Sequence, residues 1–207
     1  MPIGPRGSLE RPAYAPGMYL MRDDRVVEQD YFRQRLRRHN RRLHSWGVVC
    51  GLSVVPAGDP RRPWGLYVCP GYALGPYGDE IVVPARVFVD VQDHLWASPV
   101  GVAPRVAHIA IRYAEHAVRP IPAPPGACGC DDTVYHASRI RESFRVDVLW
   151  ALSDQPPEDD VDPCDAVPRP CPECPPSPYV WLACVRLPPS EGDPIPRDLI
   201  DNDKCRS

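Results

Sequence analysis

Cysteines gather in two proline-rich stretches of this 207-residue chain. The first stretch holds a Cys-x-Cys motif and the second a Cys-x-x-Cys motif, and thiolates at such spacings can hold a tetrahedral Zn²⁺ from a tight turn. A closed structural site needs four ligands, which the two motifs supply together if their loops meet. The predicted ligands are Cys128, Cys130, Cys171 and Cys174, with Cys164 or His136 as an alternate for one of them.

Disulfides and free thiols are the alternatives to zinc. The chain has nine cysteines, so a framework built of disulfides alone would leave one thiol over. The N-terminal residues hold no apolar signal segment, so we expect no secretion signal and a cytoplasmic protein, in which clustered cysteines favour a metal. A thioredoxin-type site is not expected, because Pro172, Pro175 and Pro176 forbid the helix that such a motif opens. Cys50 and Cys69 fall within predicted strands and are expected in the core.

Signatures of catalysis are absent from the sequence. There is no Gly-x-Ser-x-Gly, His-Glu-x-x-His, P-loop or Gly-x-Gly-x-x-Gly motif. The acidic run 157–162 lacks the glycine-bearing pattern of a calcium loop and is interpreted as a solvated loop. His39 and His44 have no carboxylate or second ligand at a suitable spacing, and His39 is expected in the core. We therefore expect a protein that is not an enzyme.

One basic amphipathic helix is predicted over residues 24–45. Asp23 or Asp24 can cap its start, and Gly47 ends it. Phe32, Leu36, His39, Leu43 and Trp46 form its apolar stripe. They are spaced by four, three, four and three residues, so the stripe lies on one narrow side of a helix. Six of the ten residues 33–42 in this helix are arginines. The predicted interface residues are Phe32, Arg33, Leu36, Arg37, Arg38, Arg41, Leu43 and Trp46.

Three interpretations of the arginines are open. Arginine binds phosphate through two parallel hydrogen bonds, which would suit a nucleic-acid surface. It is also enriched in protein interfaces, where it can pair with acidic partners, and it occurs on solvated helix faces. No aromatic residue interleaves with the basic face, and the net charge is −3. A protein interface is therefore the preferred interpretation, and nucleic acid is not an expected partner.

The remaining elements predict a mainly β fold. Twenty-nine prolines limit long helices, and about seven short strands are expected. Strong ones are predicted at 106–113, 144–150 and 179–187, a further one over 48–55, and a short edge strand in the C-terminal tail. This pattern indicates a β-sandwich or small barrel with one N-terminal helix and long proline-rich loops. No apolar run is long enough to span a membrane.

Three parts of the chain are expected. Residues 1–18 are predicted to form an extended arm, with a disordered tail as the alternative. Residues 19–152 and 179–207 are predicted to form a single β-rich domain. Between these two stretches, residues 153–178 carry prolines, cysteines and acidic residues but few apolar ones, so they are predicted to be a loop insertion.

Several short motifs occur along the chain, in the segments 27–32, 37–54, 68–73, 78–83, 138–144, 181–187 and 200–202. These segments resemble a family of bacterial proteins found with phage-tail-like machinery. Three of the motifs, Gly-Val-Val-x-Gly-Leu-x-Val, then Val-x-Pro-Gly-x-Ala and Gly-x-Glu-Ile-Val-Val, are also similar to β-rich attachment domains of phage tail fibres and baseplates.

The resemblance implies a structural subunit of a contractile injection system or phage tail, of the baseplate, fibre-attachment or cap type. Such a protein would assemble into a cytoplasmic particle or virion as a homo-oligomer, with sheath, tube, baseplate or fibre proteins as partners. The resemblance implies no catalytic residue. A free-standing, zinc-stabilised module that binds protein or carbohydrate is the alternative, and an enzyme with an unrecognised site is a third possibility.

Overall fold

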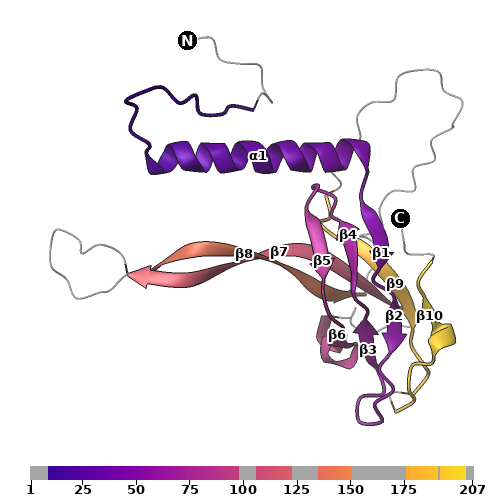
Figure 1. Ribbon diagram of the computed structural model, residues 1–207. Helices are drawn as coiled ribbons and strands as arrows, with labels where there is room; N and C mark the ends of the chain where they lie inside the picture. The colour runs from indigo at the N-terminus through magenta and orange to yellow at the C-terminus, as the bar shows by residue number, and fades with distance from the viewer. Residues whose placement is uncertain (1–8, 98–105, 123–134, 151–175, 191, 204–207) are drawn as a thin grey trace, which may run out of the picture.

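The computed structural model describes residues 9–97, 106–122, 135–150, 176–190 and 192–203. These residues form one α-helix, ten strands and two short 3-10 helices (Figure 1). The strands belong to three antiparallel sheets. The predicted mainly β class with one N-terminal helix is therefore confirmed, and the sheets of the described residues do not close into a barrel.

The first two sheets are built from short strands, and the chain passes back and forth between the two sheets. One sheet has the order β1-β4-β5 and the other β2-β3-β6. A hairpin or short connection links each strand to the next, so both sheets come from residues 47–90. The strands are β1 (Gly47–Gly51), β2 (Val54–Pro56), β3 (Gly65–Val68), β4 (Gly71–Leu74), β5 (Glu80–Val83) and β6 (Val87–Asp90).

The predicted strand over residues 48–55 is two strands in two different sheets. Gly51 and Leu52 both have a positive φ, of 66° and 56°, and this kink carries the chain from β1 to β2. A Cβ at Gly51 would lie 2.2 Å from the carbonyl oxygen of Pro70, so only glycine fits there. Cys50 in β1 is exposed, and Cys69, directly after β3, is partly exposed. The prediction that both are core residues was therefore wrong.

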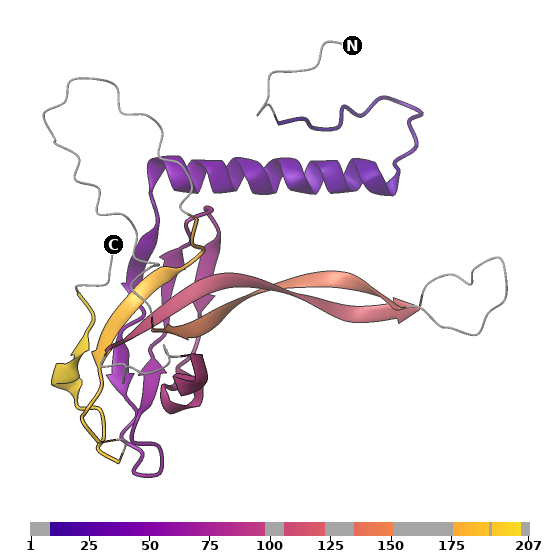
Figure 2. The ribbon, with the colours of Figure 1, turned by 180° about the vertical axis from the view of Figure 1, so that it is seen from behind.

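The third sheet has the order β10-β9-β7-β8. It consists of β7 (Val106–Pro122), β8 (Tyr135–Leu149), β9 (Val180–Arg186) and β10 (Ile200–Asp201). β7 and β8 are far longer than the predicted strands, because they continue beyond the core as a two-stranded ribbon. We call residues 113–122 and 135–144 the hairpin arm. Both ribbon views show the arm and the helix extending from the sheets towards the same side (Figures 1 and 2).

All three sheets share one apolar core. Alternation along β5 points Ile81 and Val83 inward, and Leu66 and Val68 do the same from β3. β9 lies in the middle of its sheet and is buried on nearly every residue. The fully buried large side chains include Leu52, Leu66, Ile81, Ile109, Ile111, Leu182 and Ile195.

The C-terminal residues join the second sheet to the third. The side chain of Asn202 accepts a hydrogen bond from the Val54 amide at 2.8 Å and donates one to the Val54 carbonyl at 3.2 Å. Nearby, the indole of Trp64 donates to the carbonyl of Asp193. The predicted C-terminal edge strand is thus present as β10. The proline-rich segment 153–178 lies mostly outside the described residues, so its prediction as an insertion stays a prediction.

Candidate assembly surface

Helix α1 (Arg22–Leu43) stands on the edge of the sheets rather than on their core. It begins two residues before the predicted start, and its N-cap is Met21, whose amide donates to Asp24 at 2.9 Å. It ends at Leu43, and the amide of His44 donates to the Asn40 carbonyl. Ser45 then adopts a φ of 62°, so the chain leaves the helix before Gly47, which is already in β1.

Polar contacts anchor the C-terminal half of α1. Asn40 is buried, and its amide donates to the Gly78 carbonyl at 3.0 Å in the turn between β4 and β5. Arg37 forms an ion pair with Asp79, the next residue of that turn. The guanidinium of Arg37 also lies over the ring of Tyr113, 5.9 Å from its centre. Because Asn40 is the one buried residue of α1, this anchor is polar rather than apolar.

Gly78 allows the helix to approach the turn this closely. Its φ is 85°, and a Cβ there would lie 2.2 Å from the carbonyl oxygen of Arg37. Glycine is therefore required both by the backbone conformation and by the neighbouring helix. The segments 37–54 and 78–83 therefore touch, and no local sequence pattern predicts this contact.

A small notch opens beside this anchor, between α1 and the base of the hairpin arm. Its lining residues are Arg33, Leu36, Arg37, Gly78, Asp79, Glu80, Tyr113 and Glu142. The hydroxyl of Tyr113 donates to Glu115 at 3.0 Å, and burial together with this neighbouring carboxylate raises the pKa of Tyr113 well above its usual value. Charges of both signs meet in the notch, but no nucleophile with an adjacent base stands there.

The predicted apolar stripe of α1 lies in solvent. Phe32 is 59% exposed, Leu36 51% and Leu43 69%. His39 is exposed as well, so its predicted place in the core was wrong, and Trp46, beyond the helix end, is half-buried. The reason is the anchor, which turns Asn40 and Arg37 towards the sheets and leaves the stripe on an adjoining side of the helix.

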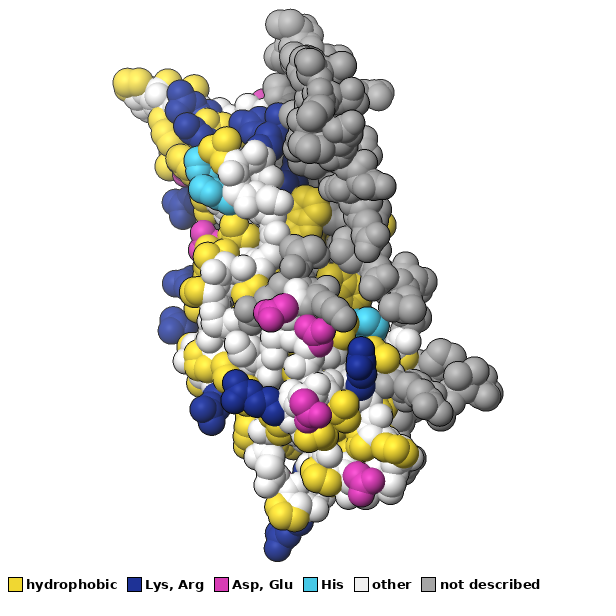
Figure 3. Space-filling view, turned by 90° about the vertical axis from the view of Figure 1, so that its right-hand side faces the viewer, with side chains coloured by type: hydrophobic (Ala, Val, Ile, Leu, Met, Phe, Trp, Pro, Cys, Tyr) yellow, Lys and Arg dark blue, Asp and Glu magenta, His cyan; other side chains and the backbone are white. Residues whose placement is uncertain are grey.

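The arginines of α1 divide between two roles. Arg37 is committed to Asp79, and Arg33 lies 3.6 Å from Asp30 within the helix. Arg38 and Arg42 are exposed and form no ion pair with any described residue. Seen along the helix from its C-terminal end, basic and hydrophobic side chains gather next to each other at that corner of the molecule (Figure 3). Arg41 is half-buried.

The hairpin arm is the second projection. β9 pairs with β7 only as far as Ile111, so beyond it each strand of the arm has the other as its one partner among the described residues. Glu115 stands directly opposite Glu142, a like-charge pair that weakens a ribbon. Along the arm, Tyr135 near the end is 63% exposed and Ile140 midway is 56% exposed.

The predicted zinc site falls outside the described residues, since Cys128, Cys130, Cys164, Cys171 and Cys174 are all there. The alternate ligand His136 is described and lies exposed on the hairpin arm. Within the described residues, no three His, Cys, Asp or Glu side chains form a group that could hold a metal. Zinc therefore stays a prediction.

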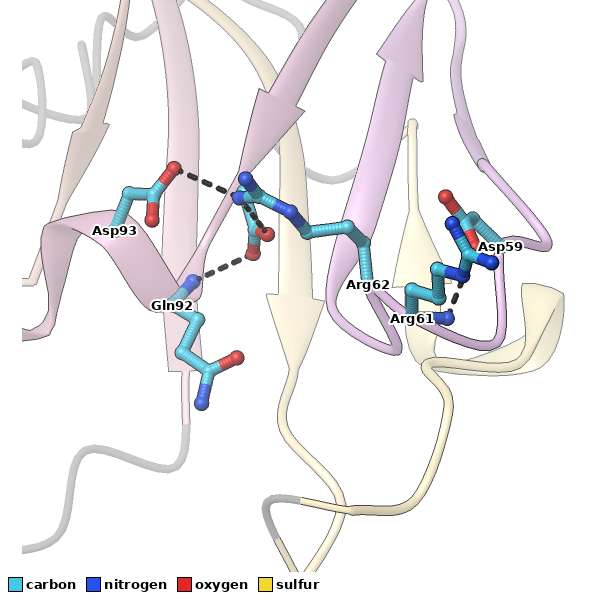
Figure 4. Close-up of polar contacts among 6 residues, drawn as sticks. Asp59, Arg61, Arg62, Gln92 and Asp93 are labelled. Carbon is cyan, nitrogen blue, oxygen red and sulfur yellow. Dashed lines mark hydrogen bonds and ion pairs between the residues drawn. The ribbon is translucent and has the colours of Figure 1, made fainter.

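A second polar cluster lies at the opposite end of the sheets, where Arg62 reaches two carboxylates (Figure 4). Its guanidinium is 2.9 Å from the buried Asp90 and 3.2 Å from Asp93, and the hydrogen bond with Asp90 is the main cause of the raised pKa of Arg62. Asp90 also accepts from the Gln92 amide at 3.0 Å. Each carboxylate has a partner, so this cluster fastens the turn before β3 to β6 and offers no open site.

Comparisons with known proteins found a distant structural likeness. No protein family matches the chain, and no curated protein matches it. Among solved structures, the chain is similar to part of the type VI secretion system TssK-TssF-TssG baseplate subcomplex, with a TM-score of 0.40 and 15% identity. The match covers 68% of this chain and 51% of that one, so this chain spans about half the length of the chain it matches.

This likeness is too distant to assign a family or a residue role. No helix among the described residues is long and apolar enough to cross a bilayer. The observation that stands on the structure itself is an anchored helix whose apolar stripe is uncovered.

Proposed function

We propose that this protein is a structural subunit of a phage-tail-like contractile particle, at a baseplate, fibre-attachment or cap position. It acts by assembly with neighbouring subunits and carries out no reaction. The motifs that resemble proteins of such machinery support this proposal, and two of these motifs form the contact between α1 and the β4–β5 turn.

The observation that carries the proposal is the exposure of Phe32, Leu36 and Leu43 on a helix that is held in place. Large apolar side chains side by side on a surface mark an interaction site more often than scattered ones do. A helix fixed in advance loses little conformational entropy on binding, so more of the contact energy is retained as affinity. Hence α1 is suited to docking on a neighbour.

The first experiment is a measurement of particle incorporation. Cell lysates would be sedimented, and the fast fraction identified by mass spectrometry, for the native chain and for Phe32→Ser/Leu36→Gln/Leu43→Gln. We expect the native chain to travel with sheath- and tube-like proteins and the triple variant to stay in the light fraction. Its circular dichroism should remain native, because the replaced side chains are outside the core.

The matched control is Val26→Gln/Val27→Gln, which changes two exposed residues of the same helix outside the stripe, 40% and 43% exposed. This control should still enter the particle. A native chain that never sediments with particle proteins would contradict the proposed function. Normal incorporation of the triple variant would show that α1 is not the docking element.

A further inference from the structure

The spacing of the exposed stripe identifies the shape of its partner. Phe32, Leu36, His39 and Leu43 follow one another at intervals of four, three and four residues, so Phe32 recurs as His39 and Leu36 as Leu43 after seven residues, which is the heptad repeat. This repeat is the seam of a coiled coil, in which each side chain inserts between four residues of a facing helix. All four residues lie within α1 and are exposed. A second helix is therefore the occupant that fits.

The anchor leaves one side of this seam open. Asn40 follows His39 directly and is buried against Gly78, so the sheets close that flank. The opposite flank carries Arg35 and Arg42, each one residue before a leucine of the seam. Both arginines are exposed, so a partner helix must approach beside them.

The charge of the open flank identifies the chemistry of the partner. No acidic residue occurs between Tyr31 and Trp46, and neither Arg35 nor Arg42 has an ion pair with a described residue. In coiled coils the residues beside the seam decide which helices pair, because opposite charges attract and like charges repel. In an antiparallel pair of two α1 helices, arginine would face arginine.

We propose that α1 binds an acidic amphipathic helix of a different subunit, with glutamate or aspartate beside an apolar seam, rather than a second copy of itself. This inference rests on the proposed function, since it names the partner of the same docking element. The seam spans about 18 Å at 1.5 Å per residue. Such a short contact is weak alone and depends on the other contacts of an assembly.

The test uses the full chain and two designed helical peptides. Both peptides carry leucine at the seam positions, and they differ in the flanking residues, which are glutamate in one and lysine in the other. We expect the glutamate peptide to bind about tenfold more tightly in a fluorescence titration. Arg35→Glu/Arg42→Glu should reverse this preference, whereas Arg61→Glu/Arg197→Glu, on exposed residues away from α1, should keep it.

Four outcomes would overturn the inference. These are equal binding of the two peptides, absence of binding by both, tighter binding of a DNA duplex than of the glutamate peptide at about 150 mM salt, and self-association that Leu36→Gln/Leu43→Gln abolishes. If any of them occurs while particle incorporation still depends on the stripe, the partner chemistry is wrong and the proposed function stands. If the native chain never enters a particle, the proposed function fails whichever peptide binds.

Discussion

The three sheets enclose a core of fully buried apolar side chains, whereas α1 leaves most of its large apolar side chains in solvent. Leu66 in β3 is fully buried, and Leu36 in α1 is 51% exposed. A surface helix of a globular protein ordinarily turns its apolar stripe to the core. In this molecule Asn40 and Arg37 of α1 contact the sheets instead.

In α1, the contacts that position the helix are therefore separate from its apolar stripe, although in most surface helices the stripe provides both position and stability. Polar contacts with the β4–β5 turn fix where α1 stands, and the apolar stripe contributes little to the stability of the isolated chain. The stripe therefore stays available for a contact outside the chain. Strands β7 and β8 show the same division along their length, since Ile109 and Ile111 are buried before the hairpin arm begins and Ile140 within the arm is exposed.

The strongest test of this comparison is one substitution made in both regions. Leu66→Ala should lower the free energy of unfolding by about 2 to 5 kcal/mol, because it leaves a cavity in a closed core. Leu36→Ala should change it by less than about 0.5 kcal/mol, because half of that side chain is already in water. Urea unfolding followed by tryptophan fluorescence measures both. Equal losses would mean that α1 belongs to the folded core after all.

A smaller effect is expected at the anchor, where two glycines form a matched pair. Gly78 and Gly58 both have a positive φ, but a Cβ at Gly58 has nothing within 4 Å. Both alanine variants incur a strain of about 1 to 2 kcal/mol. Only Gly78→Ala also collides with the backbone of α1.

We therefore expect Gly78→Ala to speed amide hydrogen exchange in residues 36–43, because loss of the anchor lets this half of the helix open. Gly58→Ala should leave exchange in α1 unchanged. Equal protection of α1 in the two variants would mean that the turn between β4 and β5 does not hold the helix.

The sequence predicts the regular parts of this molecule well, because their pattern is local. The helix is visible from its periodicity, β9 from its apolar run, and β10 from a short apolar segment near the end. What periodicity cannot show is the direction in which an amphipathic helix faces. A stripe containing Phe32 and Leu43 suits a core contact and a partner contact equally, and the anchor at Asn40 decides between them.

The other features that the sequence did not predict also depend largely on contacts between residues far apart in the chain. The split of β1 from β2 depends on a kink at Gly51 that the carbonyl of Pro70 enforces, and no local pattern shows it. Arg37 was grouped with the interface arginines, although its nearest acidic partner is Asp79, forty-two residues away in the sequence. The length of the hairpin arm was missed because its exposed strands lack an apolar face.

The smallest expected effect is on the pH dependence of stability, and it arises from a buried histidine of the sheets. His108 is buried in β7, with Nδ1 3.4 Å from the Cys184 sulfur and its ring edge-on to Trp181. Burial lowers the pKa of His108, so as the pH falls the unfolded chain binds a proton first, near pH 6.5. The contribution of His108 to stability is therefore full above about pH 6.5 and falls as the pH drops through this range towards the lower folded pKa.

The free energy of unfolding between about pH 7.5 and pH 5 should show a weaker pH dependence in His108→Leu, whereas His136→Leu, on the exposed arm, should match the native chain. An unchanged slope in His108→Leu would place the acid sensitivity of the fold in its carboxylates instead.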